Sequence, residues 1–356
     1  MTWNHGGDWA GFEYSTGKRP LDFSASVSPL GMPEGARLAA AAALRQAGAY
    51  PDPLCRGLRN ALSGHLGVPP EQILCGNGAS DLIYRLAFAL RPGCALLTAP
   101  AFSEYEAALD LTGCRIRRFP LREDNGFLLE EAFLNQITPE TDAVFLCNPN
   151  NPTGRTVEPG LLKRILERCG ASGAWLILDE CFLDFLEDPS GHTLLPELDG
   201  RRLLILRAFT KFYGMAGLRL GYCLCADTEL LSRMARSGPP WPVSHPAQEA
   251  GIAALKETGY ARRLRELIRT QRPKLAEGLE ALGFLVVPGE AIFLLFYAGS
   301  GQLGEGLRRR GILIRDCRNF HGLGPGWYRI AVRTEKENAA LLAAMREVTD
   351  GWQSGS

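Results

Sequence analysis

The chain has 356 residues, and its 39 basic side chains balance its 39 acidic ones. This length accommodates two domains of ordinary size with a substantial core. The zero formal charge gives no electrostatic footprint for nucleic acid or an anionic membrane surface, and no apolar run approaches the ~20 residues of a membrane span. We therefore expect a cytoplasmic protein that acts on a small molecule, with no nucleic-acid or membrane partner.

The ten cysteines are scattered along the chain, and several lie inside apolar runs, where a thiol behaves as a small hydrophobe. No CxxC pair is present, so neither a zinc site nor a thioredoxin-like redox motif is indicated. The sequence predicts reduced cysteines and no metal centre.

Residues 1–36 are predicted to form an irregular N-terminal arm. The arm is rich in glycine and proline, and only 21–27 is a short apolar segment. Its aromatic side chains indicate that it packs on the rest of the protein. Alanine-rich 36–47 and the spacing of 56–66 then predict two helices, separated by the breaker Tyr50-Pro-Asp-Pro.

From residue 73 to 208 short apolar runs alternate with amphipathic helical segments. The runs are 73–75, 95–99, 143–147, 175–179 and 203–208, and the helical segments include 79–90, 103–111 and 159–169. Such strands with helical crossovers predict an α/β fold whose central sheet is mainly parallel and covered on both faces. Ligands bind such sheets at the carboxyl ends of the strands. We assign 37–238 to this large domain.

Residues 239–356 are predicted to form a smaller α+β domain that the arm completes. A breaker cluster, Gly238-Pro-Pro-Trp-Pro, precedes a long helical stretch over 246–282. The strand-like segments that follow are 284–287, 293–297, 312–315 and 327–332, and the predicted closing helix is 335–348.

One lysine, Lys211, follows the run 203–208 within the segment RAFTKFYGMAGLRLGY. Taken alone, such a lysine is usually a solvated charge. A lysine can instead form a Schiff base when its amine is neutral or beside a proton acceptor, and its pKa responds readily to its surroundings. Three upstream motifs favour this second interpretation and together indicate a pyridoxal-phosphate site.

The first motif is Asn77-Gly-Ala-Ser80, between a strand and a helix that begins near Ala79, where free N–H groups and a hydroxyl suit a phosphate. An ordinary capped turn would use the same residue types. The second is the loop NPNNPTG at 148–154, whose asparagines offer amide donors. The third is Asp179 at the end of an apolar run, either a helix cap or a buried charge that needs a partner such as a protonated pyridine nitrogen.

The order NGAS, PAFSEY, NPNNPTG, LDE and TKFYGMAGLRLGY resembles the fold-type I pyridoxal-phosphate enzymes of the histidinol-phosphate aminotransferase group, over nearly the whole chain. Several segments are more similar to the threonine-phosphate decarboxylases of cobalamin biosynthesis. These segments are HGG near the start, LDFSA with PLGMP, YPDP, TKFY, WPV, and the long blocks IRDCRNFHGL and YRIAVRTEKEN.

The resemblance implies roles for individual residues. Lys211 and Asp179 would be catalytic, Phe102 would stack on the pyridoxal ring, and Asn151 would contact the ring oxygen. The residues implied to bind the cofactor are Ala79, Ser80, Phe102, Asn151, Asp179, Thr210, Lys211 and Arg219, with Tyr50 reaching it from the other subunit of a homodimer. Those implied to bind the substrate are His5, Gly6, Ser28, Asn151, Arg315 and Arg329, without deciding which arginine takes which anionic group.

The chain departs from the family pattern at positions that mostly surround the substrate. Serine stands at 26, 28 and 244 where asparagine is usual, isoleucine at 292 where asparagine is usual, and alanine at 208 where a phosphate-binding hydroxyl is usual. These positions, Ser26, Ser28, Ala208, Ser244 and Ile292, bear on the substrate more than on the cofactor.

Three functional hypotheses follow. The first is decarboxylation of O-phospho-L-threonine, or a related phospho-amino acid, to aminopropanol phosphate. The second is a histidinol-phosphate-type aminotransferase, against which Phe182 weighs because that group usually has tyrosine at this position. The third is a protein that binds pyridoxal phosphate without catalysis.

Overall fold

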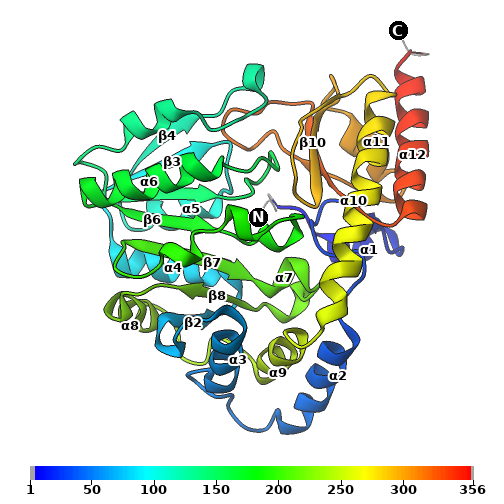
Figure 1. Cartoon of the computed structure of the whole chain (residues 1–356). Helices are drawn as coiled ribbons and strands as arrows, with labels where there is room; N and C mark the ends of the chain where they lie inside the picture. The colour runs from blue at the N-terminus through cyan, green and yellow to red at the C-terminus, as the bar shows by residue number, and fades with distance from the viewer. Residues whose placement is uncertain (1–4, 354–356) are drawn as a thin grey trace.

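Two lobes of different size make up the fold, a large α/β lobe and a smaller α+β lobe beside it (Figure 1). The computed structural model describes residues 5–353. Among these residues no helix combines the length and the apolar composition of a bilayer span. All ten cysteines are free thiols.

The large lobe contains a seven-stranded sheet of order β2-β8-β7-β6-β5-β3-β4. Only β8 runs antiparallel to its neighbours within this sheet. The strands are β2 (Ile73–Gly76), β3 (Cys94–Ala99), β4 (Arg115–Pro120), β5 (Ala143–Cys147), β6 (Trp175–Asp179), β7 (Leu203–Ala208) and β8 (Gly221–Leu224). The predicted α/β fold with a mainly parallel sheet is confirmed.

Helices cover both faces of this sheet, which explains why its central strands are apolar throughout. In β6, Leu176 and Leu178 pack with one helical layer and Ile177 packs with the other, since successive side chains of a strand point to opposite faces. The first layer contains α2 (Glu34–Ala43), α3 (Arg56–Leu66), α6 (Pro159–Ser172) and α9 (His245–Ala254), and the second contains α4 (Gly78–Leu90), α5 (Glu104–Asp110) and α8 (Thr228–Arg236).

The small lobe has a four-stranded antiparallel sheet of order β12-β13-β10-β9 with helices packed on it (Figure 1). Its elements are α10 (Thr258–Glu280), β9 (Leu285–Val286), β10 (Phe293–Tyr297), α11 (Leu303–Arg308), β12 (Arg315–Asp316), β13 (Trp327–Ala331) and α12 (Glu335–Gln353). One apolar cluster joins these helices to the sheet and includes Phe23 of the arm.

The N-terminal arm is more ordered than the sequence predicted. It forms α1 (Trp9–Thr16) and β1 (Leu21–Asp22), and β1 pairs in parallel with β11 (Ile312–Leu313). The helix has no strong apolar period to reveal it, but Asp8 accepts a hydrogen bond from the Gly11 N–H at its start and Gly17 ends it at φ 69°. The prediction of an irregular arm is therefore wrong over α1.

Two further local predictions need correction. The stretch predicted as one helix over 246–282 is two helices, and α9 packs in the core of the large lobe rather than with α10. We therefore propose that a boundary near 255–257 divides the lobes better than one at 238/239. The edge strand β4 was not foreseen because its side chains are largely exposed and form no apolar run.

Candidate active site

A cavity of about 540 Å³ lies at the carboxyl ends of β5, β6 and β7, where the large lobe faces the small lobe and the arm. The strand ends contribute Cys147, Asp179 and Ala208, and the small lobe contributes Arg315 and Arg329. Because parallel strands end at the same edge of the sheet, side chains distant in sequence meet here. The volume is in the usual range for a small-molecule site.

The cavity brings together all but two of the residues predicted to form the site. The predicted residues that line it are His5, Gly6, Ala79, Ser80, Phe102, Asn151, Asp179, Thr210, Lys211, Arg219, Arg315 and Arg329, joined by Ser26, Ala208 and Phe182. Their individual roles remain predictions. The hydrogen bonds and burial of each side chain decide whether it can reach a ligand in the cavity.

Lys211 lies on the short helix α7 (Phe209–Phe212), directly after β7, and faces the cavity. Burial lowers the pKa of its amine to about 8, and the positive charges of Arg329 and Arg219 act in the same direction. The neutral amine, which is the form that attacks a carbonyl carbon, is therefore more populated near neutral pH than in an ordinary lysine.

Asp179 is buried at the end of β6 and is held by two neutral donors. The Tyr105 hydroxyl donates to Oδ2 at 2.5 Å, and the Cys181 N–H donates to Oδ1 at 2.9 Å. No ion pair joins Asp179 to a basic side chain within residues 5–353. Its carboxylate is thus oriented into the site, near the Lys211 amine but in no ion pair with it, which suits a cationic ring nitrogen.

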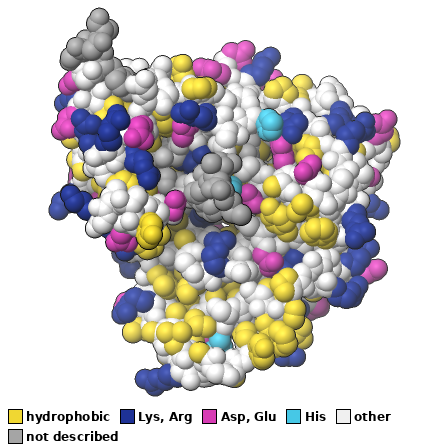
Figure 2. Space-filling view, turned by 180° about the vertical axis from the view of Figure 1, so that it is seen from behind, with side chains coloured by type: hydrophobic (Ala, Val, Ile, Leu, Met, Phe, Trp, Pro, Cys, Tyr) yellow, Lys and Arg dark blue, Asp and Glu magenta, His cyan; other side chains and the backbone are white. Residues whose placement is uncertain are grey.

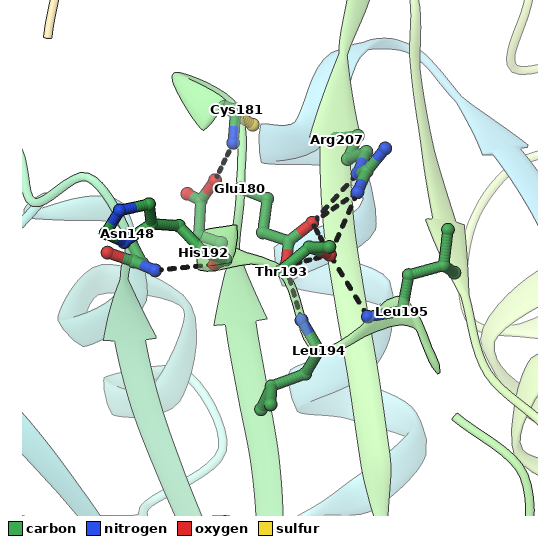
Figure 3. Close-up of polar contacts among 9 residues, drawn as sticks. Asn148, Glu180, Cys181, His192, Thr193, Leu194, Leu195 and Arg207 are labelled. Carbon is green, nitrogen blue, oxygen red and sulfur yellow. Dashed lines mark hydrogen bonds and ion pairs between the residues drawn. The ribbon is translucent and has the colours of Figure 1, made fainter. Parts of the chain in front are cut away.

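The next residue, Glu180, points to the other side of the strand and forms a separate buried network (Figure 3). Arg207 donates to it through Nε at 2.9 Å and lies 2.7 Å away through Nη2, and the Thr193 hydroxyl donates at 2.8 Å. The Leu194 N–H adds a donor at 3.3 Å. This network fixes the ends of β6 and β7, and with them Asp179 and Lys211. Sequence reasoning did not identify it.

The first turn of α4 and the Arg219 side chain form a concave surface, called here the α4 cradle, whose N–H groups and positive charge suit a phosphate. Gly78 has φ +79°, and a Cβ on it would lie 2.9 Å from Nη2 of Arg219, while a Cβ on Gly221 would lie 2.6 Å from the Ala79 nitrogen. Asn77 makes no side-chain capping hydrogen bond, so the first N–H groups of the helix are left for a ligand.

Two buried arginines from the small lobe face the cavity without an acidic partner in the described part of the chain. Arg329 donates through Nη1 to Asn151 Oδ1 and through Nη2 to the Ser24 carbonyl at 3.2 Å, while its Nε is buried without a partner. Burial lowers its pKa to about 10. Arg315 donates to Asn319 Oδ1 at 2.7 Å and lies over the Phe320 ring. Such guanidinium groups suit carboxylate or phosphate.

The contact with Arg329 also defines how Asn151 is oriented. Its carbonyl oxygen Oδ1 is already an acceptor, which leaves the amide Nδ2 as the group available to donate. This is the orientation that a contact with a pyridoxal ring oxygen requires.

Four residues singled out in the sequence lie away from the cavity. Tyr50 is 79% exposed and stacks on Trp241, with ring centroids 4.4 Å apart. Ser28 Oγ accepts from the Tyr260 hydroxyl at 2.6 Å, which places it behind the wall rather than at a substrate. Ser244 caps α9, and Ile292 is fully buried in the small-lobe core.

The set of donors and charges therefore fits pyridoxal phosphate, and comparison with known proteins decides the family. The model of the family Aminotransferase class I and II matches residues 18–345. The chain belongs to this family. As a class I and II member it is a pyridoxal-phosphate enzyme, with Lys211, Asp179 and the α4 cradle as the residues that would hold the cofactor.

Relatives of two activities are similar to this chain. It is 40% identical over 335 residues to a threonine-phosphate decarboxylase of Salmonella typhimurium, a match that covers 93% of this chain and 92% of the relative. It is 36% identical to histidinol-phosphate aminotransferase 1 of Cupriavidus pinatubonensis, covering 91% of this chain and 87% of that one.

A solved structure shows the same fold. The histidinol-phosphate aminotransferase of Sinorhizobium meliloti in complex with pyridoxal 5'-phosphate superposes with a TM-score of 0.85 at 23% identity, covering 97% of this chain and 95% of that one. The fold-type I architecture and the pyridoxal-phosphate cofactor predicted from the sequence are confirmed.

Proposed function

We propose that this enzyme decarboxylates O-phospho-L-threonine, or a related phospho-amino acid, to aminopropanol phosphate and carbon dioxide, as a step of cobalamin biosynthesis. The observation that carries the proposal is the pair Arg315 and Arg329, two buried guanidinium groups in one cavity with Lys211. A phospho-amino acid has two anionic groups, a carboxylate and a phosphate. The similarity to the Salmonella decarboxylase supports the same choice.

When bound, pyridoxal phosphate withdraws electrons from the bonds at the substrate's Cα. The protein groups then have distinct tasks. Asp179 would hold the protonated ring nitrogen, the α4 cradle with Arg219 would hold the cofactor phosphate, and Phe102 would stack on the ring.

The remaining tasks concern the substrate and one proton. Arg315 and Arg329 would grip its anionic groups and set which bond at Cα is aligned for cleavage. Lys211 Nζ, whose pKa is lowered to about 8, would give a proton to Cα after carbon dioxide leaves.

A substrate panel tests this proposal. Purified enzyme loaded with pyridoxal phosphate is incubated separately with phosphothreonine, phosphoserine and unphosphorylated threonine, and released carbon dioxide is trapped and counted. We expect release from phosphothreonine and far less from threonine. If neither phosphorylated amino acid gives carbon dioxide, the proposal fails.

A histidinol-phosphate aminotransferase is the second candidate, favoured by the 36% identity to the Cupriavidus enzyme. The buried Phe182 lines the cavity and offers no hydroxyl there, which weighs against it. Incubation with histidinol phosphate and 2-oxoglutarate separates the two activities. Glutamate formation without carbon dioxide release from phosphothreonine would establish transamination in place of decarboxylation.

We also propose a cytoplasmic homodimer. Large apolar side chains are exposed on the end of the large lobe that carries α2 and α3, where yellow side chains gather in the lower part of Figure 2. They include Leu38 (55% exposed), Leu44 (61%), Tyr50 (79%), Leu54 (52%) and Trp241 (42%). A second copy would cover this surface and bring Tyr50 towards its partner's cavity. Light scattering should give twice the 38.9 kDa chain mass; a monomer would exclude the role of Tyr50.

A further inference from the structure

A carboxylate at the mouth of the cavity, Glu104, links three elements. Its Oε1 lies 3.0 Å from Nε2 of His5 in the arm, and its Oε2 accepts a hydrogen bond from the Tyr84 hydroxyl of α4 at 2.9 Å. Glu104 and His5 both line the cavity. The three side chains form a relay from α4, through the first turn of α5, to the start of the arm.

The relay connects the two lobes. The arm is anchored to the small lobe by β1 pairing with β11, but His5 reaches across to α5 of the large lobe. The His5 ring also meets the edge of Phe102, with centroids 6.1 Å apart. Residue 5 is therefore one point at which the arm contacts the large-lobe side of the cavity.

The backbone beside His5 has little freedom. A Cβ on Gly6 would lie 2.3 Å from the Ser24 carbonyl oxygen, and the Gly7 N–H donates to Ser24 Oγ at 2.8 Å. The same Ser24 carbonyl accepts from Arg329. The position of His5 and the position of a substrate-facing arginine are thus joined through one residue.

The charge on Glu104 makes its partners necessary. The hydrogen bond with His5, and to a smaller degree that with Tyr84, lowers its pKa, so it is an ionised acceptor at neutral pH. The Nε2 atom of His5 must then carry the proton between them. An ionised oxygen is a stronger acceptor than a neutral one, so Glu104 can hold the His5 ring and the Tyr84 hydroxyl in place.

We infer that Glu104 is a positioning residue: it holds His5 over the cavity mouth, and Tyr84 orients Glu104, so that substrate affinity depends on a relay that does not touch the reacting atoms. The inference rests on the proposed function only in that the substrate is anionic. It assigns a role to two residues, Glu104 and Tyr84, that no sequence motif had singled out.

The same helix offers an internal comparison. Two residues along α5, Glu106 lies 3.2 Å from Nε2 of His321, in the small-lobe loop that also carries Phe320, and it pairs with Arg118. Glu104 and Glu106 therefore each contact a histidine from outside the large lobe, but only Glu104 contacts the arm. Substituting each in turn separates an effect on the arm from a general loosening of α5.

The test combines two measurements on the full-length holoenzyme. Variants Glu104→Gln and Tyr84→Phe are compared with Glu106→Gln and with Glu140→Gln, a surface carboxylate paired with Arg115 and 75% exposed. Hydrogen exchange of peptides covering 5–16 and 317–324 is measured by mass spectrometry without substrate. KM and kcat are then measured with phosphothreonine.

We expect Glu104→Gln and Tyr84→Phe to speed exchange in 5–16 but not in 317–324, and Glu106→Gln to do the reverse. Glu104→Gln should raise KM about tenfold and Tyr84→Phe about threefold, as the loss of a charged or a neutral hydrogen bond implies, with kcat within about threefold of wild type. Glu140→Gln should change neither measurement.

The two readouts keep this inference separate from the proposed function. If exchange in 5–16 does not change in Glu104→Gln, or if kcat falls while KM stays constant, the positioning role is wrong. If exchange changes as expected but no phosphorylated amino acid is turned over by any variant or by wild type, the relay stands and the proposed function fails.

Discussion

The two sides of the cavity are built in different ways. On the large-lobe side, Asp179 is held from its own lobe by Tyr105 and by the Cys181 N–H, and the neighbouring Glu180 network fixes the strand ends. On the other side, the arm and small-lobe side chains retain buried polar atoms without partners, such as Ser26 Oγ and Arg329 Nε. We propose that the first side holds the cofactor and that the second binds the substrate.

We infer from this difference that the chemistry and the choice of substrate depend on separate surfaces of the cavity. Changes on the large-lobe side should abolish turnover or destabilise the lobe. Changes on the small-lobe side should alter affinity and leave the cofactor in place.

Lys211→Ala should reduce kcat about a thousandfold, because it removes both the amine that attaches the cofactor and the proposed proton donor. Lys163→Ala is the matched control, since that lysine is 62% exposed and pairs with Glu197 at 3.6 Å on the surface. Carbon dioxide release gives the rate, and circular dichroism confirms the fold. Retention of more than a tenth of the activity would remove Lys211 from the mechanism.

Adjacent carboxylates Asp179 and Glu180 should respond in opposite ways to substitution. Asp179→Asn removes the charge that would hold the ring nitrogen, so kcat should fall about a hundredfold while the melting temperature changes little. Glu180→Ala leaves Arg207 buried without its partner and should lower the free energy of unfolding by about 3 to 5 kcal/mol.

Thermal and urea unfolding of these variants, with Glu140→Ala as a surface control, would check the pair. The unfolding midpoints of the variants are compared with that of the wild-type protein. Equal losses of stability in Asp179→Asn and Glu180→Ala would show that both residues are structural, against the division proposed above.

Arg329→Gln should lower kcat/KM about a hundredfold through KM, because truncating one partner of a buried charged contact costs about 2 to 5 kcal/mol. The absorbance of bound pyridoxal phosphate should be unchanged. Arg333→Gln is the control, since Arg333 donates hydrogen bonds to the Asp22 carbonyl and to Glu337 instead. Loss of the cofactor absorbance in Arg329→Gln would place this arginine on the cofactor side.

The smallest effect concerns the pH at which Lys211 becomes reactive. Because burial lowers its pKa, its neutral fraction should rise through a midpoint near pH 8 instead of the ordinary 10.5. Acetylation of the apoprotein with a limiting reagent, followed by mass spectrometry of the Lys211 peptide, measures this midpoint. The exposed Lys163 peptide serves as the internal reference, and a common midpoint for both would contradict the stated burial effect.

The sequence was sufficient for features that leave a local pattern. The apolar runs of β5, β6 and β7 and the motifs at their ends identified the sheet and most of the cavity, since strand ends of a parallel sheet must meet. Helix α1 and strand β4 left no such pattern, because one is short with a weak apolar face and the other lies exposed at the sheet edge.

Other parts of the site depend on contacts that no local pattern reveals. Tyr105 and Glu104 stand inside the quoted PAFSEY motif, but their partners, Asp179 and His5, are about 75 and 100 residues away in the chain. Ser28 looked like a substrate contact and instead accepts from Tyr260, 232 residues further on. Tertiary packing decides such roles, and only the folded chain shows them.

The central claim, that this cavity is the pyridoxal-phosphate site and Lys211 its attachment point, can be tested by one measurement. The holoenzyme is reduced with borohydride, digested, and its peptides are sequenced by mass spectrometry. We expect a pyridoxyl label on Lys211, and no label when apoprotein without pyridoxal phosphate is treated in the same way. A label on any other lysine would contradict it.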